Sequence, residues 1–410
     1  MIPAMRDIEA DILIIGAGLV GAAQALALSK EGIRSVIVER DTPENVLALE
    51  YDGRVSAISH ASVQVMKHIG IWETLLPHAG PMNDIRVVDE DSPALVHFSH
   101  TEVGSEPFGY MLPNVFLRQT LLRAVMNNSN ITYLPQTELE STTAADNHRI
   151  STLKDGRTIR SSLLLAADGK FSQTREMLAV GHRITEYGQT AIVATVKHSQ
   201  PHHGIAVEQF LPAGPLALLP MTEDRTAVVW TEPHAMAKHI MQLPEEAFIE
   251  ELEARLKGYL GSCIIQGKRH AYPLALIQAD KYYVERAALI GDSAHGIHPI
   301  AGQGVNLGYR DVAVMTDIIA NQKKLGLDLG SLTALEHYQQ WRKFDAWSMA
   351  AVTDGLNRLF STNRPLTRLV RRLGLSTFQR FSPLKQMFMQ TAMGMQGDLP
   401  RMLQPESKAA

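Results

Sequence analysis

The sequence predicts an α/β protein in which buried parallel strands alternate with helices, joined to a second region of antiparallel strands. Residues 11–39 follow the order strand, glycine turn, helix, strand and acid, and residues 287–320 repeat the order strand, loop and helix. Between these units lie short segments of alternating or apolar strand character, such as AIVATVKH at 191–198 and TAVVWTEP at 226–233. A chain of 410 residues is long enough for about two domains.

The first unit carries a glycine pattern typical of dinucleotide binding. DILII at 11–15 is typical of a buried parallel strand, and GAGLVG follows where the chain turns into a helix. We expect Gly16 to permit the tight turn, Gly18 to let the backbone approach a pyrophosphate, and Gly21 to let helix and strand pack closely. Glu39 ends the second strand, where its carboxylate would accept the ribose hydroxyls of an adenosine. The pattern predicts a Rossmann-like fold with a bound dinucleotide, but it does not choose between NAD and FAD.

The composition excludes several classes of protein. The net charge of −4 gives no reason to expect a nucleic-acid partner. Cys263 is the only cysteine, which excludes an intrachain disulfide and a cysteine-rich metal site and fits a reducing cytosol. The apolar run at 12–28 has the length of a short membrane span or signal peptide, but its flank is acidic and its glycines fall at the strand-to-helix turn, so we favour a buried strand and helix.

The stretch GDSAHGIHP at 291–299 allows three interpretations. A hydrolase nucleophile elbow needs the pattern GxSxG, but Ser293 is followed by Ala and His, so the second glycine is missing. His295 and His298 have a spacing found in metal sites, but the glycine and proline around them disfavour a helix, and no third ligand is near in the sequence. The third interpretation, a loop that binds a polar ligand, is the one that we favour, and we expect no metal.

The flanks of this stretch support a ligand-binding loop. AALIGD is an apolar strand that ends in Asp292, and a carboxylate at the carboxyl end of a strand is well placed to bind hydroxyl groups. GQGVNLGYRDVAVMTDIIA is a glycine-rich entry to an amphipathic helix. Its core-facing residues are predicted to be Val305, Val312, Met315 and Ile319.

Three motifs, in this order along the chain, resemble those of the flavoprotein aromatic hydroxylases of the para-hydroxybenzoate hydroxylase type. They are GAGLVG with Glu39, LLLAADGKFSQTR at 163–175, which fits DGxxSxxR, and GDSAHGIHPIAGQGVNLG at 291–308, which fits GDxxHxxxPxxGxGxN. YDGRVSAISHASVQVMKHIGIW, GPLALLPM and KRHAYPLAL are similar to the ubiquinone-biosynthesis branch of that family. The likeness extends to about residue 395.

The resemblance implies a site for FAD that draws residues from all three motifs. Asp292 would hold the ribitol, Pro299 would lie near the isoalloxazine ring, and Arg54 would reach the flavin or its phosphates. Asp168 and Gly169 would serve the flavin and the nicotinamide donor together. The full set of predicted cofactor-binding residues is Gly16, Gly18, Gly21, Glu39, Arg54, Arg118, Asp168, Gly169, Asp292, Pro299, Gly302, Gln303, Gly304 and Asn306.

The family also implies the domain organisation. The FAD-binding domain would be discontinuous, with predicted bounds of 1–80, 101–180 and 271–340. The substrate domain would be an antiparallel sheet formed by 81–100 and 181–270. A C-terminal helical region would follow at 341–410. Residues 355–397 contain no acid, and basic and apolar side chains alternate along them. This pattern predicts either a basic amphipathic surface for a membrane or partner, or a basic face on helices that pack on the protein itself.

The implied activity is that of an FAD-dependent monooxygenase of ubiquinone biosynthesis. It would use NAD(P)H and O2, through a flavin C4a-hydroperoxide, to hydroxylate the ring of a polyprenylated phenol, with 2-polyprenyl-6-methoxyphenol as the expected substrate. Another ring position, another aromatic substrate, or a flavin-binding assembly subunit of the quinone pathway stay open as alternatives.

The sequence identifies no catalytic residue. A base that deprotonates the phenol would help the reaction, and the side chains of suitable type are Tyr187, Tyr272, His295 and His298. We expect a cytoplasmic protein that touches the inner face of the membrane through its C-terminal region and meets other ubiquinone-biosynthesis proteins there.

Overall fold

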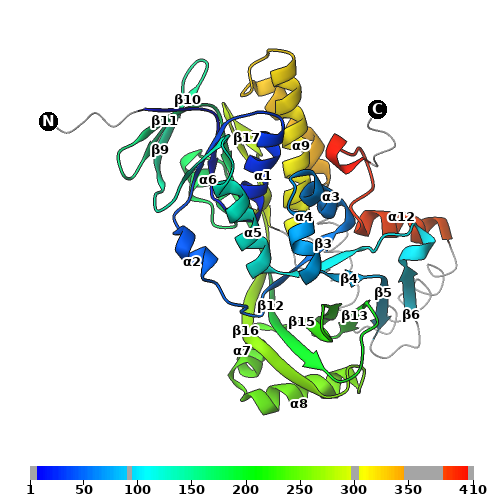
Figure 1. Cartoon of the computed structure of the whole chain (residues 1–410). Helices are drawn as coiled ribbons and strands as arrows, with labels where there is room; N and C mark the ends of the chain where they lie inside the picture. The colour runs from blue at the N-terminus through cyan, green and yellow to red at the C-terminus, as the bar shows by residue number, and fades with distance from the viewer. Residues whose placement is uncertain (1–6, 90–94, 297–303, 346–381, 405–410) are drawn as a thin grey trace.

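The computed structural model describes residues 7–89, 95–296, 304–345 and 382–404, and within these ranges the chain forms three sheets with helices packed against them (Figure 1). The α/β class is confirmed. The first sheet and the second sheet contain eight strands each, and the third contains three.

The first sheet is the parallel one that the glycine motif predicts. Its main order is β17-β18-β11-β1-β2-β8, in which the pairs from β18 to β8 are parallel, and the hairpin of β9 and β10 extends from β11. The bounds of its strands and adjoining helices are β1 (Ile8–Ile15), α1 (Leu19–Lys30), β2 (Ser35–Val38), α5 (Asn114–Met126), β8 (Ile131–Leu134), β9 (Leu139–Ala144), β10 (Arg149–Leu153), β11 (Thr158–Ala166), α6 (Gln173–Met177), β17 (Tyr283–Val284), β18 (Ala287–Leu289) and α9 (Gly304–Lys324).

The apolar run at 12–28 is divided between β1 and α1, so the predicted strand, turn and helix are confirmed. The residues of β1 from 12 to 15 are buried on both faces, as a central parallel strand requires. On α9, Val312, Met315 and Ile319 are fully buried as predicted, while Val305 is partly buried against the same core.

The second sheet has the order β19-β16-β12-β15-β14-β13-β5-β6, and all neighbours are antiparallel except β5 and β13. Its outer face packs on helices α7 and α8 through a core that includes Leu216, Trp230 and Phe248. The bounds are β5 (Asp84–Asp89), β6 (Leu95–Ser99), β12 (His182–His198), β13 (Ile205–Leu211), β14 (Gly214–Pro220), β15 (Arg225–Pro233), α7 (His234–Gln242), α8 (Glu245–Leu256), β16 (Cys263–Ala279) and β19 (His295–Gly296).

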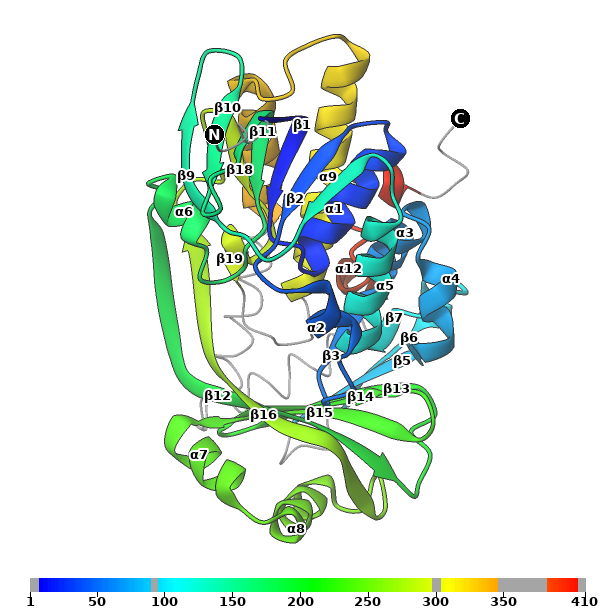
Figure 2. The ribbon, with the colours of Figure 1, turned by 60° about the vertical axis from the view of Figure 1, so that its left-hand side comes forward.

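Two long strands and one loop connect the first and second sheets. β12 and β16 contain 17 residues each, which at about 3.3 Å per residue gives roughly 55 Å, and they pair side by side from one part of the molecule to the other (Figure 2). The chain also crosses at 290–296, because β18 belongs to the first sheet and β19 to the second. The predicted domain bounds stay a prediction.

The third sheet contains β3, β7 and β4 in that order, and its strands fall between residues 55 and 113. The remaining elements are α2 (Pro43–Leu47), β3 (Val55–Ser59), α3 (His60–His68), α4 (Trp72–Leu75), β4 (Gly80–Met82), β7 (Gly109–Pro113) and α12 (Ser382–Ala392), with a further helical segment at 332–345.

Most of the acid-free segment at 355–397 falls outside the described residues. In α12, Lys385 forms an ion pair of 2.7 Å with Glu102. Met389 of the same helix and Met393, which directly follows it, are buried in a cluster with Phe98. This described part packs on the protein itself, and contact between the rest of the segment and a membrane stays a prediction. Within the described ranges, we find no helix whose length and apolar character would carry it across a bilayer.

The packing of α8 on the second sheet predicts the effect of a core substitution. Phe248 is fully buried, and its ring centroid lies 5.9 Å from that of Trp230. We expect Phe248→Ala to lower the free energy of unfolding by about 3–5 kcal/mol, because it removes apolar burial and leaves a cavity. Urea unfolding followed by fluorescence measures the change. Glu250→Ala, at an exposed position of the same helix, should change it by less than about 0.5 kcal/mol; equal effects of the two would contradict the packing described.

Candidate functional site

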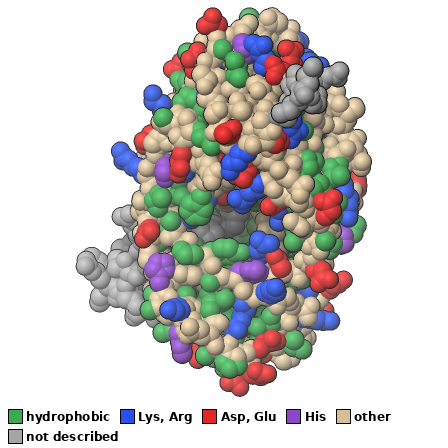
Figure 3. All heavy atoms as spheres, turned by 90° about the vertical axis from the view of Figure 1, so that its left-hand side faces the viewer, with side chains coloured by type: hydrophobic (Ala, Val, Ile, Leu, Met, Phe, Trp, Pro, Cys, Tyr) green, Lys and Arg blue, Asp and Glu red, His purple; other side chains and the backbone are tan. Residues whose placement is uncertain are grey.

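A cavity of about 510 Å³ lies where the three sequence motifs meet the second sheet. Gly18, Gly169, Asp292 and Gly304 line it from the side of the first sheet. The opposite wall, which we call the inner face of the second sheet, comprises Ala191, Val193, Glu208, Pro215, Ala217, Leu219, Val229 and Thr231. Figure 3 shows the surface hollowed at mid-height, with hydrophobic side chains along the edge of the hollow. The fold therefore brings residues that are far apart in the sequence to one ligand-sized space.

Three glycines present bare backbone at this cavity. No heavy atom lies within 4 Å of the position that a Cβ would take at Gly18, Gly169 or Gly304. Gly16 and Gly21 differ: Gly16 has a φ of +101°, and a Cβ on Gly21 would overlap the Gly16 carbonyl oxygen. These two glycines build the turn, whereas the other three leave room for a ligand against the main chain.

The amino-terminal end of α1 is open to an anion. Gly18 occupies the N-cap position, and neither a capping side chain nor an acidic side chain occupies the first turn, so its N–H groups and partial positive charge are available to a pyrophosphate. Glu39 lies beside this turn, and its carboxylate accepts hydrogen bonds from the N–H groups of Ala17 (2.6 Å) and Asp41 (3.0 Å). Arg118 is 3.7 Å from the carboxylate of Asp41 and is not part of the cavity's described lining.

Asp292 and Arg54 supply charge to the cavity. Asp292 lies three residues after the end of β18, in the loop that leads to β19, and its carboxylate makes no hydrogen bond with the residues that the structure describes. Removal from bulk water raises the pKa of Asp292, while the charges of His295 and Lys170 oppose that rise. A carboxylate with unused acceptor positions fits the hydroxyl groups of a ribitol chain. Arg54 is held by Asp52, with Nη2 2.6 Å from Oδ2.

Two predicted site residues use their side chains to hold loops. Asp168 accepts hydrogen bonds from the Ser172 hydroxyl (2.5 Å) and from the Thr174 N–H (2.9 Å). Asn306 accepts one from the Ser59 N–H (2.9 Å) and donates one to the Ala57 carbonyl (3.0 Å). Pro299, Gly302 and Gln303 lie outside the described residues. Contact between each predicted residue and the cofactor therefore stays a prediction.

Ser293 has a structural position that does not suit a nucleophile. It is fully buried, and its hydroxyl donates to the carbonyl of Ala166 (2.7 Å) at the end of β11. The carbonyl of Ser293 accepts a hydrogen bond from Arg175 Nη1 (2.9 Å), the arginine of the DGxxSxxR motif. This hydrogen bond joins the second motif to the loop that the third motif forms.

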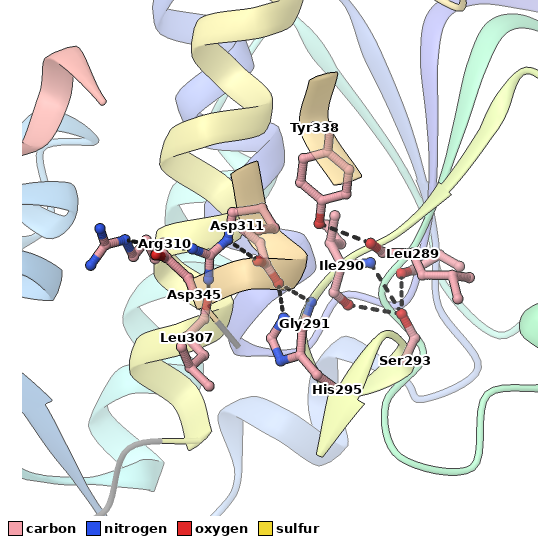
Figure 4. Close-up of polar contacts among 12 residues, drawn as sticks. Leu289, Ile290, Gly291, Ser293, His295, Leu307, Arg310, Asp311, Tyr338 and Asp345 are labelled. Atoms are coloured by element: carbon pink, nitrogen blue, oxygen red, sulfur yellow. Dashed lines mark hydrogen bonds and ion pairs between the residues drawn. The ribbon is translucent and has the colours of Figure 1, made fainter. Parts of the chain in front are cut away.

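A buried cluster of Asp311, His295 and Arg342 holds the loop against α9, and Figure 4 shows Asp311 with its contacts to Gly291 and His295. Asp311 Oδ2 lies 2.7 Å from His295 Nε2 and accepts a hydrogen bond from the Gly291 N–H (2.8 Å), and Oδ1 accepts one from Arg342 Nε (2.6 Å). Burial opposes ionisation of Asp311, but His295 and Arg342 lower its pKa below the ordinary value. Among the described residues, no cluster of three metal-ligating side chains occurs.

This cluster was not predicted from the sequence, although one signal for it is present there. Asp311 lies four residues before Met315 on α9, so helical spacing places this acid on the buried face. A carboxylate on a buried face needs a partner of opposite charge. Arg342 is 31 residues further along the chain, and no local pattern connects the two.

Comparison with known proteins agrees with this geometry. Residues 9–352 match the family model described as an FAD binding domain. The chain is 44% identical over 388 residues to the ubiquinone hydroxylase UbiL of Rhodospirillum rubrum. The aligned region covers 95% of this chain and 90% of the relative. This chain belongs to the family of FAD-dependent aromatic hydroxylases. The family membership predicted from the three motifs is therefore confirmed, together with FAD as cofactor and the monooxygenase class.

Other family members are similar over nearly the whole chain. The 3-demethoxyubiquinol 3-hydroxylase of Escherichia coli is 32% identical over 393 residues, which cover 95% of this chain and 100% of the relative. The structure of p-nitrophenol 4-monooxygenase PnpA from Pseudomonas putida superimposes with a TM-score of 0.78 at 17% identity, and the match covers 96% of this chain and 99% of PnpA. The latter likeness shows a shared fold.

The cavity geometry predicts how a single methyl group affects cofactor binding. A Cβ at Gly18 meets nothing in the protein but would project into the cavity. We expect Gly18→Ala to weaken FAD binding about tenfold or more, which corresponds to about 1.4 kcal/mol, with little loss of stability in the apoprotein. Gly104→Ala is the matched control, because that position also has free space around it and does not line the cavity. Flavin fluorescence titration measures both; unchanged affinity in Gly18→Ala would place the cofactor elsewhere.

The Asp311 cluster predicts a large effect on stability. We expect Asp311→Asn to destabilise the fold by about 3–5 kcal/mol, because it removes the buried negative charge that Arg342 and His295 contact and leaves the buried guanidinium of Arg342 with Asp345 as its one remaining charged partner among the described residues. Chemical denaturation of wild type and variant measures the difference. Asp317→Asn on the same helix is the control, since the side chain of its partner Arg401 is 62% exposed, and it should cost less than about 1 kcal/mol.

Proposed function

We propose that this protein hydroxylates the aromatic ring of a polyprenylated phenol in ubiquinone biosynthesis, with 2-polyprenyl-6-methoxyphenol as substrate and NAD(P)H as electron donor. The observation that carries the proposal is the cavity in which three cofactor motifs face an apolar sheet. The name of the relative UbiL supports a quinone substrate. The Escherichia coli relative is named for 3-demethoxyubiquinol, which favours hydroxylation at another ring position as the second candidate.

The residues on the first-sheet side would bind and orient the cofactor. The open end of α1 at Gly18 would hold the pyrophosphate, Glu39 the adenosine ribose, and Asp292 the ribitol hydroxyls. FAD supplies the redox chemistry when bound: two electrons come from NAD(P)H, one oxygen atom of O2 enters the ring and the other leaves as water.

The inner face of the second sheet would bind the substrate and exclude water. Ala217, Leu219 and Val229 present apolar side chains to the cavity, and apolar surface favours burial of an aromatic ring. A dry cavity also protects reactive oxygen chemistry from unproductive reaction with water. The polyprenyl tail would bring the protein to the membrane surface, where the basic residues of 355–397 would meet lipid or other proteins of the pathway.

Deletion of the gene in a quinone-producing cell tests this proposal, with mass spectrometry of the quinone intermediates. We expect 2-polyprenyl-6-methoxyphenol to accumulate, and wild-type protein with FAD, NAD(P)H and O2 to convert it to a product with one more oxygen atom. Accumulation of an earlier or later precursor would support the other ring position. An unchanged quinone pool would contradict both, and tight FAD binding without NAD(P)H oxidation would favour a flavin-binding assembly subunit.

A further inference from the structure

A single carboxylate interrupts the otherwise apolar row of side chains across the inner face of the second sheet. Glu208 of β13 lies opposite Ala217 of β14, which lies opposite Val229 of β15, which in turn lies opposite Val193 of β12. Residues in register on neighbouring strands point to the same face of a sheet. All four line the cavity, so Glu208 faces the same space as the cofactor motifs.

Glu208 has no partner within the part of the chain that the structure describes. Its carboxylate makes no hydrogen bond and no ion pair there, although an unpaired carboxylate in a mainly apolar wall costs free energy. The other ionisable side chains that line the cavity are Arg54, Lys170, Tyr272 and Asp292. Desolvation raises the pKa of Glu208 to about 7. The fold therefore keeps a weakly solvated carboxyl group in the space proposed for the substrate.

Among the described residues, no neighbouring charge shifts the pKa of Glu208, which desolvation alone raises. Tyr51, which precedes the third sheet, packs against the cluster that contains Ala217, and its hydroxyl donates to Thr195 at 2.5 Å. Arg86 of β5 is adjacent in register to Val207 and influences Tyr259 near α8, on the outer face of the sheet. The carboxylate is thus free to bind a ligand hydroxyl.

We propose that Glu208 accepts the proton of the substrate's phenolic hydroxyl. The phenol O–H bond breaks, a carboxyl O–H bond forms, and the substrate becomes a phenolate. A phenolate is a better electron donor than a phenol, so it reacts more readily with an electrophilic oxygen. This inference rests on the proposed function, and it assigns a base for which the sequence alone offers only candidates by residue type.

The other candidate bases suit this role less well. His295 is bound to Asp311 beneath the loop, and His298 lies outside the described residues. Tyr272 lines the cavity, but burial raises its pKa further above 10, so it is protonated near neutral pH. Asp292 follows β18 on the first-sheet side of the cavity, where it would bind the cofactor.

The chemistry of Glu208 suits proton transfer from a phenol. A simple phenol such as tyrosine has a pKa of about 10 and an ordinary glutamate about 4.3, so a carboxyl group at about 7 is a better match for the transfer. The accepting form is the anion, which predominates only above this pKa. The rate of hydroxylation of the bound phenol should therefore increase as the pH rises through about 7, and it should be low at pH values where the carboxylate is protonated.

Glu208→Gln tests the inference, with 2-prenyl-6-methoxyphenol as the probe. Glutamine keeps the shape and a hydrogen bond but cannot accept the proton. We expect FAD affinity to change less than about twofold, product formation to fall about 10²- to 10⁴-fold, and the rise in kcat through pH 7 to disappear. Glu223→Gln is the matched control, because its side chain is 78% exposed in the turn after β14, and it should behave as wild type at every pH.

A second readout does not depend on turnover. When the oxidised, FAD-loaded wild type binds the probe without NAD(P)H, the affinity, followed by the change in flavin absorbance, should increase as the pH rises through about 7, because the Glu208 carboxylate accepts a hydrogen bond from the phenol. This pH dependence should be absent in Glu208→Gln and partly restored in Glu208→Asp. A pH dependence of binding or of kcat that persists in Glu208→Gln would overturn the assignment, and loss of FAD binding would indicate a structural role. Wild type that binds and hydroxylates none of the phenol would instead refute the proposed function, and with it this inference.

Discussion

The ion cluster of Asp311 is the interaction on which the geometry of the site depends. One carboxylate on α9 binds the main chain at Gly291, the imidazole of His295 and the guanidinium of Arg342. It thereby fixes the loop that carries Asp292 to the helix that begins at the cavity. Desolvation of buried charges offsets much of their attraction, so such a cluster contributes more to defined geometry than to net stability.

The two sides of the cavity present different kinds of chemical groups to a ligand. The first-sheet side offers main chain, through glycines and an uncapped helix end, and main chain is suited to phosphates and ribose. The second sheet offers side chains at alternate positions of four strands. β12 and β16 pair from residue 182 to residue 198 of β12, with register shifts at 186–190 and 193–195, so one antiparallel pair links the two sides.

The sequence predicted the features that depend on neighbours along the chain. The turn at Gly16, the open backbone at Gly18 and the acid at Glu39 all follow from local spacing, and the structure has them in these positions. Contacts across long sequence separations could not be predicted, such as the bond from Arg175 to the Ser293 carbonyl. Glu208 was missed because strand alternation gives two faces, and only the pairing with distant strands decides which face lines the cavity.

The inner face of the second sheet also explains why the sequence identifies the protein family more readily than it identifies the substrate. Exchanging a side chain at one of its alternate positions reshapes the space for an aromatic ring, while the ladder of hydrogen bonds and the glycine turns stay intact. Ala217 and Ala191 occupy such positions with one methyl group each. A few substitutions of this kind would change which aromatic ring fits the space while the glycines and Asp292 on the first-sheet side stay in place, so selectivity and redox chemistry can diverge independently in one scaffold.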